Sequence, residues 1–399
     1  MRPCPICDAA ACEVLHQQKF VLPQGHPLTA GYDVVCCKRC GFVYADTTVS
    51  QADYDRFYAE FSKYEDRQTS TGGGDAPWDA QRLGATAAYI AGCLPDRRAR
   101  ILDIGCANGG LLRALRDLGW ANVVGVDPSA ACVENTSRLH GIEAHVAWLS
   151  AISVGLGQFD CVILSHVLEH VSSLHPAVRS LSDLVRPGGI AYVETPDATR
   201  YAEFVTAPFQ DFNTEHINHF SLRCLANLFR SAGWNALAMG QKVILSAPQM
   251  PYPAVYTVFA HEPGEAYGFI LSPDTELPGQ IRAYIARSQA SLDELSATIR
   301  AALRNSPELI VWGTGQLTMK LLAETPLGEA QIVAFVDSNP INQGRLLRDV
   351  PILAPEAIRG MAQPILVAST LHQDEIVAVI RSRMGLTNPL ILLSSRTNA

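Results

Sequence analysis

The stretch Arg100–Leu115 reads RILDIGCANGGLLRAL, and it decides which fold the chain can adopt. An apolar run, ILDI, is followed by a glycine-rich turn and then by the apolar residues of a helical pattern. Gly105 and Gly109 would let the backbone approach a ligand closely, and the start of a helix favours negative charge through its dipole. The stretch therefore predicts a strand, a ligand-binding turn and a helix.

Further apolar runs, NVVGVD, FDCVILS and GGIAYVET, alternate with helical patterns over roughly residues 75–245. This alternation predicts a doubly wound α/β domain, in which helices cover a parallel sheet. Asp127 ends the run VVGVD, where a carboxylate can accept hydrogen bonds from both hydroxyls of a ribose. These features alone would also fit a nicotinamide-cofactor fold.

The composition limits the classes of protein to consider. The chain has 399 residues, 48% of them hydrophobic and 18% charged, which predicts a soluble globular protein of two or three domains. A formal net charge of −8 argues against broad nucleic-acid binding. We expect no signal peptide and no membrane span. Eleven cysteines without a signal sequence predict a reducing compartment, the cytoplasm.

Two CxxC pairs, Cys4–Cys7 and Cys37–Cys40, lie in an N-terminal region expected to end near residue 70. Two such knuckles can hold a zinc ion by four thiolates, which leaves no open position for chemistry. We therefore predict a structural Zn²⁺ site that folds a segment with little apolar surface of its own. Cys36 is a competing ligand without the two-residue spacing. The alternative is that these cysteines are free or redox-active.

The C-terminal third contains a long helical pattern, about 276–305, and then a second alternation of strands and helices. In LIVWGTGQLTMKLL, Gly313 and Gly315 occupy a strand–helix turn, and Asp337 follows the next strand. Thr318 stands where a third glycine would complete a dinucleotide fingerprint, so we do not expect NAD. This Rossmann-like unit is expected either to hold a nucleotide diphosphate on its turn or to serve as a lid or dimer surface.

The stretch EHINHFS places Glu215, His216 and His219 in the loop before an amphipathic helix, SLRCLANLFRSAGW. Ser221 suits the N-cap of that helix. A metal site here would need a third ligand that the local sequence does not supply. His216, beside Glu215, is the candidate general base, because histidine titrates near neutral pH and a carboxylate can orient it. His219 is expected to make loop hydrogen bonds.

The motif DIGCANG resembles the glycine-rich motif of class I S-adenosylmethionine (SAM)-dependent methyltransferases. The resemblance covers the middle region in order, since FDCVILSHVLEHV is similar to the family's fourth strand and LVRPGGIAYVETPD to the entry of its fifth. Ala107 departs from the glycine usual in the middle of the turn. The resemblance implies that SAM is bound by Asp103, Gly105, Cys106, Gly109 and Asp127, with Ser165 and His166 nearby. His166, Glu169 and His170 follow the fourth strand, where contact with ligand and simple helix packing are both open.

The whole layout is similar to zinc-containing C-methyltransferases that act on nucleotide-linked keto-sugars. It implies an N-terminal Cys4 zinc unit (1–70), a methyltransferase domain (71–245), and a linker helix with a Rossmann-like domain (246–399). It also implies proton removal beside a ketone by Glu215 and His216, assisted by Tyr64, with Tyr58 as the competing tyrosine. An enolate would then attack the methyl group, its oxygen stabilised by a donor. The expected partner is a small molecule, and the chain is expected to be a monomer or homodimer.

Two departures from that family concern the acceptor. The stretch GQKVILSAPQMPYPAVY lacks a usual glycine pair, and the C-terminal turn VWGTGQLTMKLL lacks a lysine–glycine pair. The alternatives are O- or N-methylation of another small molecule or natural-product intermediate, and a non-catalytic zinc-ribbon interaction protein. The methyl donor is therefore better defined by the sequence than the acceptor.

Overall fold

The computed structural model describes residues 2–60, 72–149, 152, 155–261 and 270–394. By its internal contacts the chain forms two compact units. The first contains residues 1–15, 35–204 and 215–281, and the second contains residues 16–34, 205–214 and 282–399. Among the described residues, no helix combines the length and the apolar character needed to cross a bilayer.

A small sheet at the N-terminus has the strand order β1-β2-β3-β9. Its last strand is a short piece of the EHINHFS stretch, which pairs antiparallel with β3 through Val43 and His219. The stretch that carries His216 is therefore attached to the segment that follows the second cysteine knuckle. The strands are β1 (Cys12–Lys19), β2 (Gly31–Cys37), β3 (Val43–Asp46) and β9 (Asn218–His219).

The central sheet has seven strands in the order β10-β11-β8-β7-β4-β5-β6. β11 pairs antiparallel with both neighbours, whereas the pairs from β8 to β6 are parallel. β4 lies between β7 and β5, so the glycine-rich turn that follows it leaves an interior strand of the sheet. The strands are β4 (Ile101–Ile104), β5 (Val123–Asp127), β6 (Glu143–Val146), β7 (Phe159–Ser165), β8 (Val185–Pro196), β10 (Trp234–Ala247) and β11 (Met250–His261).

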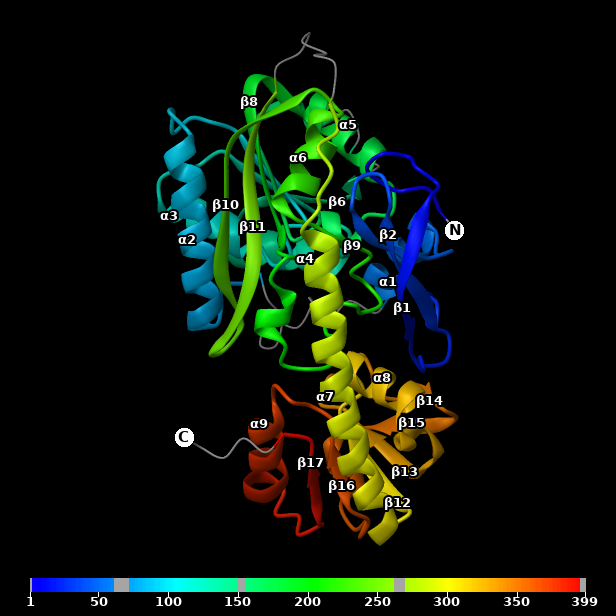
Figure 1. Cartoon of the computed structure of the whole chain (residues 1–399). Coiled ribbons are helices and arrows are strands. Elements are labelled where there is room, and N and C mark those ends of the chain that lie inside the picture. The colour runs from blue at the N-terminus through cyan, green and yellow to red at the C-terminus, as the bar shows by residue number, and fades with distance from the viewer. Residues whose placement is uncertain (1, 61–71, 150–151, 153–154, 262–269, 395–399) are drawn as a thin grey trace. The chain divides into compact units, whose positions relative to one another are not determined.

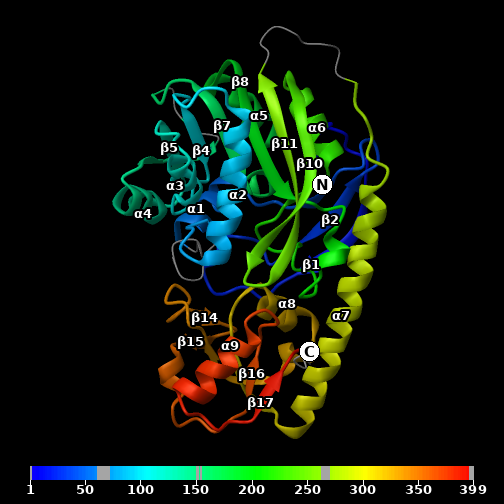
Figure 2. The ribbon, with the colours of Figure 1, turned by 90° about the vertical axis from the view of Figure 1, so that its left-hand side faces the viewer.

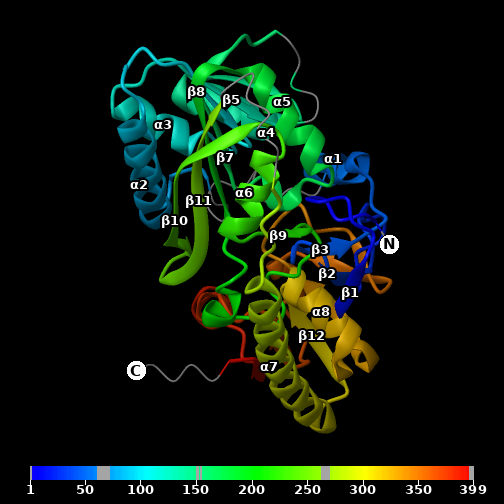
Figure 3. The same cartoon turned by 45° about the horizontal axis from the view of Figure 1, so that its top comes forward.

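Helices cover both faces of the central sheet (Figures 1 and 3). α2 and α3 pack on the face that presents Ile101 and Ile163, whereas Phe229 of α6 stacks on Phe259 of β11 with ring centroids 4.0 Å apart. The helices of this unit are α1 (Gln51–Glu60), α2 (Pro77–Cys93), α3 (Gly110–Asp117), α4 (Ala130–His140), α5 (Leu174–Leu184) and α6 (Leu222–Arg230), with 3₁₀ turns η3 (Leu168–His170) and η4 (Tyr201–Phe204).

A long helix, α7 (Leu277–Asn305), precedes the C-terminal sheet (Figure 2). The strand order of this sheet is β14-β15-β13-β12-β16-β17. Its apolar core includes Ile310, Trp312 and Val336. The strands are β12 (Glu308–Trp312), β13 (Gln331–Val336), β14 (Leu346–Leu347), β15 (Val350–Leu353), β16 (Ile365–Val367) and β17 (Leu390–Leu392). The helices are α8 (Gln316–Glu324) and α9 (Gln373–Ala378), with short turns η5 (Pro326–Glu329), η6 (Pro355–Ile358) and the π-helical η7 (Val379–Arg383).

The predicted fold class is confirmed, including the doubly wound central sheet and the C-terminal sheet, which is parallel except for the antiparallel pair of β14 and β15. The long helix predicted at 276–305 is also present, as α7. The central sheet includes β11, which ends at His261, beyond the predicted boundary at residue 245. The division into three domains stays a prediction.

Candidate functional site

The turn between β4 and α3 depends on backbone conformations that favour glycine. Gly105 and Gly109 both have φ 78°. A Cβ atom on Gly105 would lie 2.8 Å from Val167, and one on Gly109 would lie 2.8 Å from Thr136, so no larger residue fits at either position without a shift. Ala107 also has a positive φ, 46°, which costs an L-residue about 1–2 kcal/mol.

Asp127 holds this turn closed. Its Oδ2 accepts a hydrogen bond from the backbone N–H of Ala107 at 2.9 Å, and its Oδ1 accepts one from the N–H of Ser129 at 2.8 Å. Each carboxylate oxygen has a second lone pair, so both can also accept hydrogen bonds from the hydroxyls of a ribose. The carboxylate is therefore fixed at the end of β5, as the ribose-binding role requires.

Asp103, in the neighbouring strand β4, has a raised pKa. Its side chain is buried, and burial, with the negative charge of Asp127 nearby, raises the pKa of Asp103 to about 8. A cation placed beside it would favour the ionised form. Asp103 thus suits the positively charged amino-acid end of a ligand.

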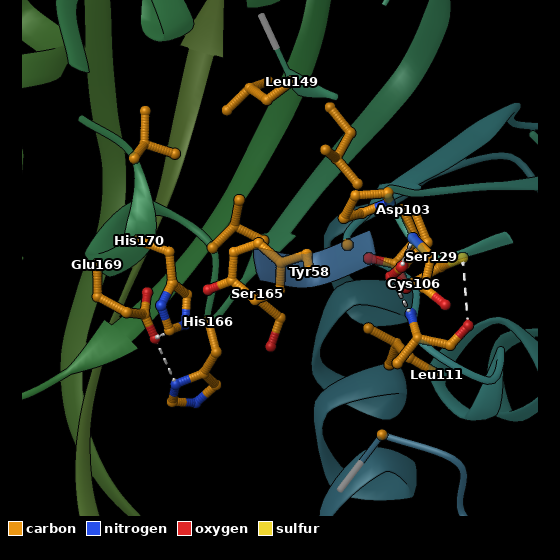
Figure 4. Close-up of a pocket in the computed structure, with 18 of the residues that line it drawn as sticks. Tyr58, Asp103, Cys106, Leu111, Ser129, Leu149, Ser165, His166, Glu169 and His170 are labelled. Atoms are coloured by element: carbon orange, nitrogen blue, oxygen red, sulfur yellow. Dashed lines mark hydrogen bonds and ion pairs between the residues drawn. The ribbon is translucent and has the colours of Figure 1, made fainter. Parts of the chain in front are cut away.

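A cavity of about 270 Å³ lies beyond these strand ends. Asp103, Cys106 and Ser129 lie on one side of it, and His166, Glu169 and His170 on the other (Figure 4). The predicted site residues that line it are Asp103, Gly105, Cys106, Asp127, Ser165, His166 and His216, together with the competing Tyr58.

Two other predicted residues, Gly109 and Glu215, are not among the described residues that line this cavity. Gly109 is the N-cap of α3, and the Glu215 side chain is buried elsewhere in the unit. Tyr64 lies outside the described residues. Cys106 lines the cavity but also packs beneath the turn, where a Cβ on Gly125 would meet its sulfur at 2.7 Å. Burial raises the pKa of the Cys106 thiol, so it is not a reactive thiolate.

His166 is held between two carboxylates immediately after β7. Its Nδ1 lies 3.1 Å from Glu169 Oε1 and its Nε2 lies 3.3 Å from Glu194 Oε1. Burial lowers the pKa of His166, but the bonds to Glu169 and Glu194 outweigh it and raise the pKa to about 9. Lys242 Nζ lies 2.5 Å from the other oxygen of Glu194. With both nitrogens engaged, His166 is an unsuitable proton acceptor.

Side chains from three segments, the helix α1, the 3₁₀ turn η3 and the loop before β9, meet at the opposite wall of the cavity. The rings of His170 and His216 are 4.9 Å apart between centroids, and the Tyr58 ring lies 5.8 Å from that of His170. Glu169, His170 and His216 place possible ligand atoms within 4.8 Å of one another. The sequence showed no third metal ligand beside His216, because the other two follow β7, far away in the chain.

The rest of the EHINHFS stretch has structural contacts. His219 is fully buried against Tyr201, and burial lowers its pKa to about 3, so it is neutral. Ser221 is the N-cap of α6 as predicted, accepting a hydrogen bond from the N–H of Cys224 at 3.1 Å. The backbone N–H of Ala45 donates to the carbonyl of Ile217 at 2.9 Å, which extends the pairing of β3 with β9.

Two parts of the cavity wall were not predicted. Three consecutive glycines, residues 72–74, follow the domain boundary expected near residue 70. Gly72 lines the cavity, and its carbonyl accepts a hydrogen bond from the N–H of Gly110 at 3.1 Å. The hairpin of β10 and β11 contributes Ile244 and Tyr252. The row of glycines was the only sequence signal for the first part, and none marked the second.

The four predicted cysteines form one cluster. Cys4 and Cys40 have their sulfur atoms 3.5 Å apart, and so do Cys7 and Cys37. Sulfur atoms around tetrahedral zinc are about 3.8 Å apart, given a Zn–S bond of about 2.3 Å. The Cys36 thiol instead donates to the carbonyls of Cys37 and Gly41. The cluster is consistent with a zinc site made by the predicted residues.

The C-terminal turn after β12 is closed by its own side chains. Asp337 Oδ2 accepts hydrogen bonds from the N–H of Thr314 at 3.0 Å and from Asn342 Nδ2 at 3.1 Å. Thr318, which replaces the third glycine, donates its hydroxyl to the carbonyl of Gly313 at 2.7 Å. Nucleotide binding at this turn stays a prediction.

The comparisons with known proteins agree with this geometry. The family described as "Methyltransferase domain" matches residues 78–238. A ubiquinone biosynthesis O-methyltransferase of Chelativorans sp. is 34% identical over 26% of this chain and 43% of its own length. The C-methyltransferase NovU of Streptomyces niveus is 25% identical over 65% of this chain and 63% of its own length. The chain thus spans less than two thirds of either relative.

A SAM-dependent methyltransferase from Mesorhizobium loti, whose structure has been solved, is 18% identical with a TM-score of 0.37, over 44% of this chain and 99% of that one. This TM-score is too low for the solved structure to support a function for the chain. The family match covers β4 to β7, the glycine-rich turn and Asp127, which together form the cofactor side of the cavity. Residues 78–238 of this chain therefore match a methyltransferase domain.

Proposed function

We propose that the chain transfers the methyl group of SAM to a carbon atom beside the ketone of a nucleotide-linked sugar. The observation that carries this proposal is that His216 lines the same cavity as the cofactor turn, Asp103 and Asp127. The similarity to NovU, a C-methyltransferase, over 65% of this chain supports carbon as the acceptor atom. The cysteine cluster supports a structural zinc ion in the same protein.

SAM supplies an activated methyl group on a positively charged sulfur. In the proposed mechanism, His216 removes the proton from the carbon beside the ketone, and the electrons of that C–H bond move to the ketone oxygen as an enolate. The carbon of the enolate then attacks the methyl group, and the S–CH₃ bond breaks. The proton leaves on His216 and is released to solvent, so His216 is regenerated.

Two further residues assist in this proposal. The Glu215 carbonyl accepts a hydrogen bond from His170 Nδ1 at 3.1 Å, which ties the loop of His216 to the turn after β7. We assign Glu215 to holding His216 in place. An enolate oxygen needs a hydrogen-bond donor. Tyr58, which lines the cavity, is one candidate, and Tyr64 is the other.

Isotope exchange tests the base directly. With enzyme and a keto-sugar nucleotide but without SAM, we expect deuterium from solvent to enter the carbon beside the ketone. His216→Gln is expected to slow this exchange by about a hundredfold or more, the range typical of an acid–base residue. His145→Gln, which alters an exposed histidine paired with Glu143, serves as the matched control and should leave the rate unchanged. Full exchange by His216→Gln would exclude His216 as the base.

O-methylation is the second candidate, favoured by the identity of 34% to the Chelativorans O-methyltransferase. It predicts no carbon exchange, because a hydroxyl group would be the nucleophile. Product mass after incubation with SAM and a panel of nucleotide sugars and phenolic acceptors then separates the two. Methyl transfer without any deuterium uptake at carbon would establish the second candidate and contradict the first.

A further inference from the structure

The group of Glu169, His170 and His216 has the composition of a metal site, two imidazoles and a carboxylate. Their possible ligand atoms lie within 4.8 Å of one another, and all three residues line the cofactor cavity. Nitrogen and oxygen donors around tetrahedral zinc lie about 3.3 Å apart, given bonds of about 2.0–2.1 Å. Small side-chain rotations would therefore bring the three donors to a bound cation.

The hydrogen bond of His170 leaves its other nitrogen available for a metal. His170 Nδ1 lies 3.1 Å from the backbone carbonyl oxygen of Glu215, which can only accept a hydrogen bond. Nδ1 must therefore carry a proton, which in the neutral imidazole leaves the lone pair on Nε2. Nε2 lies 4.0 Å from Glu169 Oε1, on the side of the cluster. A metal-ligating histidine almost always donates its other N–H in this manner.

The Glu169 carboxylate is a second, independent observation that points to a bound cation. Its side chain is 1% exposed. Its Oε1 accepts from His166, while its Oε2 is buried and has no hydrogen-bond partner among the described residues. Burying a carboxylate oxygen unpaired is costly, and a cation bound beside it removes that cost. Figure 4 shows this carboxylate between His166 and His170 at the cavity wall.

The surrounding charges leave room for a further positive charge. Glu169, in the turn after β7, and Glu194, in β8, are both buried carboxylates. Lys242 and His166 both contact Glu194, whereas the ion pairs of Glu169 within the described part of the chain are with His166 and His170. A dication at the Glu169 side would therefore meet a carboxylate that no lysine or arginine contacts among the described residues.

We propose that Glu169, His170 and His216 bind a divalent first-row transition ion such as Zn²⁺, at a site separate from the cysteine cluster. Three protein ligands leave an open coordination position, which can take a water molecule or an oxygen of the acceptor. The cation and a proton compete for His216. The consequence for catalysis rests on the proposed function. A cation bound to His216 prevents it from accepting a proton, so metal binding should suppress the exchange of solvent deuterium into the carbon beside the ketone.

Cobalt distinguishes the two sites by spectroscopy. The full-length protein, with the metal of its cysteine cluster retained, is titrated with Co²⁺. We expect one further equivalent to bind with ligand-field bands but without the thiolate-to-cobalt charge-transfer band of a Cys4 site. Glu169→Gln, His170→Gln and His216→Gln should each weaken this binding at least about tenfold, as losing one ligand would. His372→Gln, an exposed histidine paired with Glu375, is the matched control and should bind as the wild type does.

Equal cobalt uptake by the wild type and all three variants would overturn the proposal, as would no uptake beyond the cysteine cluster. Because a single variant could misfold, SAM affinity and circular dichroism are measured for each, and the three substitutions lie on two separate segments. Carbon exchange is then measured with and without Zn²⁺. Suppression supports both proposals. Stimulation supports the metal site but contradicts His216 as base, and absence of exchange in the metal-free enzyme contradicts the proposed function alone.

Discussion

The charge of Asp103, in the proposed cofactor site, depends on pH. Because burial raises its pKa to about 8, the carboxyl is largely protonated near pH 7 in the unliganded protein. A bound cation such as the ammonium group of SAM favours the ionised form, so binding releases a proton. The pKa therefore falls on binding, and affinity must rise with pH.

We expect the Kd for SAM to decrease as the pH rises towards 8, by up to about tenfold per pH unit below that value. Asp103→Asn should bind SAM more weakly and lose this dependence, because it has no proton to release. Calorimetry at several pH values, in buffers of different ionisation enthalpy, measures both the affinity and the proton released. A wild-type affinity independent of pH between about 6 and 8 would contradict the assignment.

Ala107 is the second test at this scale. Its φ of 46° costs about 1–2 kcal/mol, and glycine adopts this conformation freely. Ala107→Gly should therefore raise the free energy of unfolding by up to about 1 kcal/mol, after the entropy lost by the more flexible unfolded chain is subtracted. The matched control, Ala114→Gly in the interior of α3, should lower it by about 1 kcal/mol. Denaturant titrations that show Ala107→Gly to be destabilising would refute this account of the turn.

A site residue could be predicted from the sequence where it follows a recognisable local pattern, such as the end of an apolar strand. Residues without such a pattern could not be predicted. Asp103, Gly105 and Asp127 were found because each stands at a fixed place beside an apolar strand. Glu169 and His170 were seen as either ligand contacts or packing residues. Their approach to His216 depends on how two loops fold back together, which no local pattern encodes.

At the scale of elements, the helix after EHINHFS begins at a side-chain cap. Ser221 accepts a hydrogen bond from the N–H of Cys224, and its hydroxyl donates to Asp274 at 2.5 Å. Asp274 in turn accepts from the N–H of Leu277 at the start of α7. Ser221 therefore fixes two helix starts in the same unit.

Ser221→Ala should lower the free energy of unfolding by about 1–2 kcal/mol, the upper range for an N-cap, because both hydrogen bonds are buried. Ser173→Ala is the matched control, since Ser173 precedes α5 but makes no capping side-chain bond in the described part of the chain. That variant should stay within about 0.5 kcal/mol of the wild type. Equal losses for both serines, measured by chemical denaturation, would show that the cap contributes little.

Element prediction succeeded where apolar periodicity was long and failed where pairing was short. The strands β4, β5, β7 and β8 and the helix α7 follow strong patterns. β9 is only two residues long, and its partner β3 lies far earlier in the chain, so periodicity could not reveal it. Periodicity also could not reveal that Ile244 and Tyr252, in the hairpin of β10 and β11, line the cavity.

For the molecule as a whole, the cysteine cluster and the proposed catalytic stretch are coupled through the small sheet. Cys37 and Cys40 precede β3, and β3 pairs with β9, three residues beyond Glu215. Gly41 is tightly enclosed, since a Cβ there would meet the Asp274 carbonyl oxygen. Loss of metal from the cysteine cluster should therefore disturb the loop of His216 more than it disturbs Asp103 or Asp127.

We expect Cys37→Ser to lose zinc and to lower methyl transfer by about tenfold or more, while SAM affinity changes little. The matched control is Cys12→Ser, which removes a thiol outside the cluster and should keep full zinc content and activity. Metal analysis, calorimetry with SAM and turnover on the same preparations give the three readouts. Loss of SAM binding together with zinc would show that the cluster supports the whole unit rather than this loop.

The most direct test of the central claim is a crystal structure of the protein with S-adenosylhomocysteine. The account predicts that the ribose hydroxyls bind Asp127, that the amino group lies beside Asp103, and that the sulfur atom points towards His216. A cavity left empty at saturating ligand, or the nucleoside bound at another place, would contradict it.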